Sequence, residues 1–153
     1  MFDRILGLFA PAKGYRTPLP EADADHALGA LLVRVAQADH AYLFQEVERI
    51  DRILARRFSL SILDAAKMRA QCERLAEEMP DTAAIVAILH DHIGQTEREE
   101  TLAAMWQVVF ADGLEHEAED EIVTLVQDMM GVDPATCARL RADAMADLAR
   151  RSA

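Results

Sequence analysis

The chain has few cysteines and no long apolar segments, the features that disulfide-rich and membrane-spanning proteins require. It contains two cysteines in 153 residues, which argues against a disulfide scaffold and favours a reducing compartment. No apolar run approaches the roughly 18 residues of a membrane span. Glycine and proline are also few, at 6 and 5 residues, and alternating β-branched patterns are missing. The sequence therefore predicts an all-α protein with no sheet.

Basic residues are missing from one long segment. Between Arg98 and Arg139 there are ten acidic residues and no lysine or arginine, in a chain whose net charge is −11. The acidity is therefore a local feature, and nucleic acid is not an expected partner. The sequence also lacks a nucleophile beside a base and a glycine-rich phosphate loop, so we expect no enzymatic activity.

The residues that are present are enough for one domain. Apolar residues make up 52% of the chain, which can supply a core without a cofactor. Residues 1–19 are predicted to form a short amphipathic helix and a linker with several prolines. Residues 20–151 are predicted to form the helical domain. With no transmembrane segment and no clear signal peptide, the expected location is cytoplasmic.

Apolar periodicity and capping residues set the expected helices. Ser61 with Asp64 forms a capping pattern, Asp81 and Asp133 are expected N-caps, and Thr96 is expected to open another helix. These signals predict seven helices, over about 20–37, 44–57, 61–79, 82–93, 96–109, 116–130 and 134–148.

An internal repeat becomes visible when the chain is shifted by 73 positions. VAQADHAYLFQEVERIDRI, residues 35–53, aligns with VVFADGLEHEAEDEIVTLV, residues 108–126. Three acidic pairs recur, namely Asp39 with Asp112, Glu46 with Glu119 and Glu48 with Glu121. Four residues of the second copy have no counterpart: Glu115, His116, Glu117 and Asp120. The repeat predicts two equivalent helical hairpins.

The repeated Ala-Asp loops carry a family resemblance, together with LLVRVAQAD, RRFSLS, MWQVVFADG and MMGVDP. In this order the motifs resemble the tellurite-resistance TerB-like family over roughly residues 23–148. The resemblance implies a domain of about seven helices with pseudo-twofold symmetry and a role in tellurite or other stress. It also implies metal binding through acidic loop residues and action with a membrane-bound protein partner, at the periphery of the inner membrane. A related domain in a DnaJ-type co-chaperone implies the alternative, an adaptor module without metal.

The resemblance assigns the motif positions Asp39 and Glu46 in the first copy, and Asp112 and Glu119 in the second. The chain departs from the family where His40 replaces a glycine. His116 lies three residues before Glu119, so on a helix the two would share a face, within reach of Asp112. Such a set suits Zn²⁺, whereas carboxylates alone suit Ca²⁺. The predicted metal ligands are Asp39, Glu46, Asp112, His116 and Glu119.

Two other interpretations of the acidic segment remain open. Glu115, Glu117 and Asp120 could form a surface that binds a basic protein segment. Alternatively the segment binds nothing, because Asp-Gly favours a turn and carboxylates stabilise the first turn of a helix. In the equivalent loop of the first copy, residues 42–44 are Tyr-Leu-Phe, and we expect these apolar side chains to cover the core.

Overall fold

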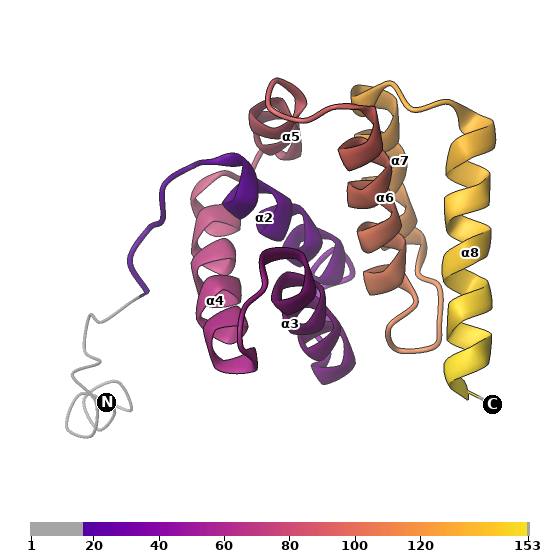
Figure 1. The fold of residues 1–153 in the computed structure, drawn as a ribbon, viewed down its shortest axis with the longest axis horizontal. Coiled ribbons are helices and arrows are strands. Elements are labelled where there is room, and N and C mark those ends of the chain that lie inside the picture. The colour runs from indigo at the N-terminus through magenta and orange to yellow at the C-terminus, as the bar shows by residue number, and fades with distance from the viewer. Residues whose placement is uncertain (1–16, 153) are drawn as a thin grey trace.

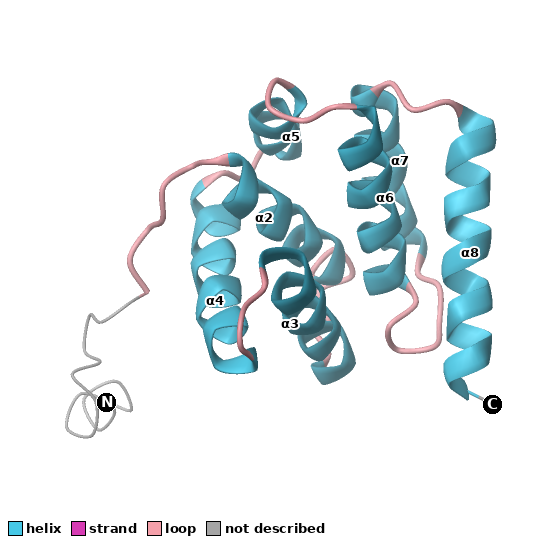
Figure 2. Ribbon diagram, viewed as in Figure 1, coloured by secondary structure: helices cyan, strands magenta, loops and turns pink. Residues whose placement is uncertain are grey.

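The computed structural model describes residues 17–152, and in this range the chain forms seven α-helices and no strand (Figure 1; Figure 2). The predicted all-α single domain is confirmed. The amphipathic helix predicted near the N-terminus lies outside the described residues. The helices are α2 (Ala24–Ala36), α3 (Phe44–Phe58), α4 (Ile62–Glu78), α5 (Thr82–His90), α6 (Gln95–Val109), α7 (Glu117–Met130) and α8 (Pro134–Ser152). None of those helices is both long and apolar enough to cross a bilayer.

Helix α2 is the centre of the fold. Residues 27–33 are all buried, as are Val35 and Ala36, and the helix packs against α3, α4, α5, α6 and α7. Gly29 permits the close approach of α4, because a Cβ added there would overlap the Cys72 Sγ. A helix covered on so many sides needs small and apolar residues all around, which its sequence supplies.

The two hairpins are α2–α3 and α6–α7, and the other helices lie on two sides of α2. In Figure 1, α3 and α4 lie together on one side, whereas α6, α7 and α8 form the other side with α8 outermost. Helix α8 packs against α6, and its buried positions include Cys137, Leu140 and Ala144. The loops that join α2 to α3 and α6 to α7 therefore belong to neighbouring hairpins of one core.

Several predicted helix ends are confirmed by their hydrogen bonds. The Ser61 Oγ accepts a hydrogen bond from the Asp64 N–H at 3.1 Å. The Asp133 Oδ1 accepts one from the Thr136 N–H at 2.9 Å. The Asp81 carboxylate caps α5 in the same way. Side chains that satisfy the free N–H groups of a first helical turn thus fix these boundaries.

Two predicted helix starts were wrong. Helix α2 begins at Ala24 rather than near residue 20, because the Asp23 side chain caps it. Helix α6 is capped at Gly94 rather than Thr96, since the Glu97 carboxylate accepts a hydrogen bond from the Gly94 N–H at 3.2 Å. In both cases a cap that the sequence pattern did not single out defines the start.

Both cysteines are free and buried. Burial raises the pKa of the Cys72 thiol to about 12, so this side chain is a small apolar core residue and not a nucleophile. Cys137 likewise belongs to the buried core.

Candidate functional site

The two Ala-Asp loops have the same local structure. The Oδ1 atoms of Asp39 and Asp112 each accept a hydrogen bond from the backbone N–H two residues later, both at 3.0 Å. The next residue in each loop has a left-handed backbone, with φ of 65° at His40 and 84° at Gly113. The aspartates therefore close two equivalent turns, and the exchange of glycine for His40 leaves the turn intact.

Each loop leads into a helix whose third residue is a buried glutamate. Glu46 in α3 and Glu119 in α7 are both 0% exposed. The Glu46 Oε1 accepts a hydrogen bond from the Leu43 N–H at 2.9 Å. Within residues 17–152, neither oxygen of Glu119 nor the Glu46 Oε2 receives a hydrogen bond from a group outside this pair of glutamates. Buried carboxylate oxygens without a donor are costly, so these three atoms require an explanation.

The two glutamates interact with one another across the hairpins. Burial, followed by the interaction with Glu46, raises the pKa of Glu119 to about 10. Burial also raises the pKa of Glu46, and the charges of Asp39 and Asp112 act in the same direction. At neutral pH the pair therefore holds a proton in place of one charge.

His116 joins the two loops next to this pair. Its Nε2 lies 3.0 Å from the Asp112 Oδ2, and its Nδ1 lies 3.7 Å from the Asp39 Oδ2. The hydrogen bond to Asp112, together with the charges of both aspartates, raises the pKa of His116. The imidazole thus bridges one aspartate from each copy of the repeat.

The expectation that His116 shares a helix face with Glu119 was wrong. His116 is the N-cap of α7 and has an extended backbone, with φ −115° and ψ 133°. The helical spacing therefore does not apply to it. The preceding turn instead brings the ring to Asp112 and Asp39.

The five predicted metal ligands lie in one region but form two groups. Glu46 and Glu119 are the buried pair, and Asp39, His116 and Asp112 form the bridge beside it. Over residues 17–152, no three or more His, Cys, Asp or Glu side chains are arranged so that they could hold a metal ion as they stand. The unpaired buried oxygens suit a cation chemically, but binding would require the bridge to open.

The doubled hairpin with paired acidic positions has a counterpart among known families. The family model described as "Tellurite resistance protein TerB" matches residues 25–142. The chain belongs to the TerB family. Members of this family are generally not catalytic. Comparison with curated proteins gave no match, and comparison with solved structures gave none either.

The acids found only in the second copy of this TerB domain have a different environment. Glu115 forms an ion pair with Arg141 of α8, with 3.2 Å between Arg141 Nε and Glu115 Oε2. Burial and the neighbouring Glu115 raise the pKa of Asp120 to about 7, and its Oδ1 is buried without a partner. Glu117 is exposed. Of the three predicted partner-surface residues, Glu115 is therefore paired with α8, and Asp120 lies partly buried beside it.

Arg141 also lies over the aromatic part of the core. Its guanidinium carbon is 5.6 Å from the centre of the Trp106 ring and 5.7 Å from that of Phe110. Such a position gives cation–π attraction in addition to the ion pair with Glu115. Sequence reasoning missed this residue, because its partner Glu115 lies 26 positions away and no local pattern links them.

The TerB domain exposes apolar side chains near the acidic loops. The expectation that residues 42–44 cover the core holds only for Tyr42, which packs on the core and donates a hydrogen bond to Glu73 at 2.7 Å. Phe44 is 74% exposed, and Leu114 in the second loop is 63% exposed. Phe44 begins α3, ahead of its buried face, and this position explains its exposure.

Proposed function

We propose that this TerB domain is a non-catalytic binding module that takes up a divalent cation at the Glu46–Glu119 pair. The supporting observation is a set of three buried carboxylate oxygens, both of Glu119 and the Oε2 of Glu46, that receive no hydrogen bond from outside the pair within residues 17–152. A cation would replace the proton that the pair otherwise holds. Asp39 and Asp112 supply the further oxygens, once the imidazole of His116 no longer bridges them.

The chemistry of the donors favours Ca²⁺ over Zn²⁺. Four carboxylates meet in this region, and Ca²⁺ prefers six to eight oxygen ligands. Both ring nitrogens of His116 already face carboxylates, so a nitrogen ligand for Zn²⁺ would have to be turned towards the ion. His116 therefore controls access to the site through its positive charge, and cation binding should strengthen as pH rises and this charge is lost.

A titration followed by thermal melting tests the proposal. Ca²⁺ should raise the melting temperature of the native chain, because an ion that binds only the folded state adds RT ln(1 + [L]/Kd) to its stability. Glu119→Gln and Glu46→Gln should abolish the shift, whereas the exposed control Glu117→Gln should retain it. If Zn²⁺ gives the larger shift, and His116→Ala removes it, the site is nitrogen-dependent.

No shift with either ion at roughly millimolar concentration, with unchanged NMR signals at Asp112 and Glu119, would refute cation binding. That outcome would leave the second candidate, an adaptor without metal that serves a stress-related, membrane-bound assembly. Exposed Phe44 and Leu114 beside the acidic loops favour this candidate, because apolar groups next to carboxylates suit a partner segment that is both basic and apolar.

A further inference from the structure

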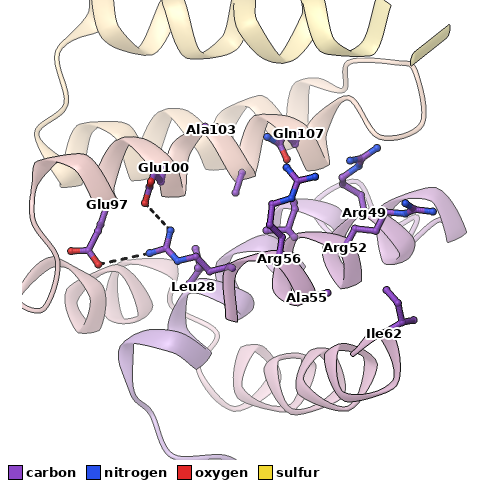
Figure 3. A pocket seen from close by; sticks show the side chains of 13 residues that line it. Leu28, Arg49, Arg52, Ala55, Arg56, Ile62, Glu97, Glu100, Ala103 and Gln107 are labelled. Carbon is purple, nitrogen blue, oxygen red and sulfur yellow. Dashed lines mark hydrogen bonds and ion pairs between the residues drawn. The ribbon is translucent and has the colours of Figure 1, made fainter. Parts of the chain in front are cut away.

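A second surface of the molecule is a groove of about 1050 Å³ that lies mainly between α3 and α6. In Figure 3, Arg49, Arg52 and Arg56 extend from α3, and Ala103 and Gln107 lie on the opposite helix. Leu28 and Ile53 also line it. The groove therefore combines basic side chains with an apolar lining, in a chain that is acidic as a whole. We call it the arginine groove.

The positive charge of the arginine groove is only partly neutralised. Arg57 forms ion pairs with Glu100 at 2.9 Å and with Glu97 at 3.8 Å, so one end of the groove is balanced. Arg52 has a single exposed contact with Glu48 at 3.7 Å, which contributes little. Within residues 17–152, Arg49 and Arg56 form no ion pair. The other end of the groove thus keeps its charge available.

The arginines follow a helical spacing. Positions 49, 52 and 56 are i, i+3 and i+7, so they share one face of α3 over roughly 10 Å of its length. Burial is the main cause that lowers the pKa of Arg49; the charges of Arg151 and Arg52 act in the same direction, and those of Asp147 and Glu48 oppose them. Carboxylates at the same spacing on a second helix would match this row.

Apolar groups at the edge of the groove indicate what else the occupant carries. Ile62 lines the groove and is 62% exposed, and its neighbour Leu63 is 66% exposed. Exposed aliphatic residues at the start of one helix are unfavourable in an isolated domain. An occupant that contributes leucine-like side chains beside its carboxylates would cover them.

We propose that the arginine groove binds an acidic amphipathic helix of a partner protein. The row of guanidinium groups pairs with carboxylates, and the apolar lining with Ile62 receives the aliphatic side chains. A nucleic acid fits less well, because Glu97 and Glu100 lie at one end and the acidic remainder of the chain repels a long polyanion. The groove is distinct from the Glu46–Glu119 pair, so its function does not depend on cation binding.

Designed helical peptides give a direct test. The probe is an alanine-based helix of about 18 residues, with three glutamates at i, i+3 and i+7 and leucines beside them. The control peptide has the same composition with its glutamates spread around the helix. Fluorescence anisotropy at about 0.15 M salt, where long-range repulsion is screened, should show at least roughly tenfold tighter binding of the probe.

Charge-reversal variants locate the binding. Arg52→Glu and Arg56→Glu should each weaken probe binding about tenfold or more, and both side chains are exposed, so circular dichroism should show unchanged helicity. Arg139→Glu, an equal charge change on exposed α8, should bind like the native chain, as should Glu119→Gln. Equal affinity for both peptides, or insensitivity to Arg52→Glu and Arg56→Glu, would overturn the proposal.

Two further measurements distinguish a partner helix from other possible occupants of the arginine groove. Sedimentation compares the native chain with Arg56→Glu at the same concentrations. A dimer that forms only with Arg56 intact would assign the groove to a second copy and overturn the partner proposal. Binding to phosphatidylglycerol vesicles, with loss in Arg52→Glu and no binding of the peptide, would assign it to a lipid surface and overturn it equally.

Discussion

The first hairpin (α2–α3) and the second hairpin (α6–α7) follow one backbone plan but satisfy their glutamates differently. In the first, Glu46 accepts a hydrogen bond from the Leu43 N–H at 2.9 Å. In the second, Glu119 occupies the same position, and no backbone N–H of the described residues donates to either of its oxygens. The aspartates behave alike, since each closes its own turn. The repeated aspartates therefore stabilise the two loops separately, whereas the repeated glutamates interact with each other.

Because of this difference, the proton shared by Glu46 and Glu119 is held mainly by Glu119. Glu46 retains one hydrogen bond that favours its charged form, whereas the pKa of Glu119 is raised to about 10. Of the acids found only in the second copy, Glu115 pairs with Arg141 of α8, and Asp120 interacts with Glu115. The sequence left two functional sets open, the metal ligands that include the repeated acids and the surface formed by the unrepeated ones. The structure shows that the repeated glutamates are the buried ones, and that only Glu46 has a backbone donor, the Leu43 N–H.

The largest expected effect comes from Glu119→Gln in ion-free buffer. An acid whose pKa rises from 4.5 in the unfolded chain to about 10 in the folded protein makes the folded state bind more protons between these values. The free energy of unfolding therefore falls as pH rises through this window. Glutamine is neutral in the folded and in the unfolded chain, so Glu119→Gln should not show this fall in the free energy of unfolding. We expect Glu119→Gln to exceed the native chain by about 2 kcal/mol near pH 8, and to match it near pH 4.

Urea denaturation at several pH values measures this difference. His116 also makes the free energy of unfolding fall as pH rises, because its pKa is raised in the folded protein. This contribution is present in the native chain and in Glu119→Gln, so it cancels in their difference. Glu46→Gln should give a smaller gain, since Glu46 keeps its hydrogen bond to the Leu43 N–H. Parallel stability curves for the native chain and Glu119→Gln would contradict the coupling of the two hairpins.

The next effect concerns Arg141 of α8, which contacts the second hairpin through Glu115 and has no equivalent in the first. Arg141→Ala removes the ion pair with Glu115 and the contact with Trp106, so we expect a loss of about 1 kcal/mol. The control is Arg139→Ala on the same helix, whose contacts with Glu99 at 3.5 Å and Asp143 at 3.6 Å are exposed. That change should cost less than about 0.5 kcal/mol.

Two readouts distinguish these variants. Urea denaturation gives the stability, and Trp106 fluorescence should respond to Arg141→Ala but not to Arg139→Ala, because only Arg141 lies against the ring. Equal losses in both variants, with no change in Trp106 emission, would mean that Arg141 contributes no more than an ordinary surface charge.

The fold could be predicted because its signals are local. Apolar periodicity placed the helices, and the side chains of Ser61, Asp81 and Asp133 marked three starts. The 73-residue repeat predicted equivalent hairpins, and the equal turns at Asp39 and Asp112 confirm that equivalence. Where a start was missed, as at Gly94, a glycine acted as the cap and the pattern gave no sign of it.

The candidate site was predictable only in part, because its defining contacts join distant residues. Composition places glutamates on the surface, so nothing in the sequence indicated that Glu46 and Glu119 are buried against each other. The opposite error occurred at Phe44, an apolar residue expected inside that is exposed. The contact of His116 with Asp39 depends on how two hairpins pack, which periodicity within one helix does not report.

The last effects, no larger than that of Arg141→Ala, test whether the two turns are equivalent. Both His40 and Gly113 have positive φ, a conformation that is unfavourable for a residue with a Cβ. A Cβ at Gly113 would meet nothing within 4 Å, so Gly113→Ala should cost about 1 kcal/mol for conformational reasons alone. His40→Gly should stabilise by less than about 1 kcal/mol, because glycine relieves the strain but gains freedom in the unfolded chain.

Urea denaturation of the two single variants and the double variant measures both effects together. Since the turns are built by separate aspartates, the two changes should be additive within about 0.5 kcal/mol. A larger departure would show that the loops are coupled through the contact of His116 with both aspartates, so that strain in one turn alters the other. His40→Gly that destabilises the protein would show that the His40 side chain contributes a contact which outweighs its backbone strain.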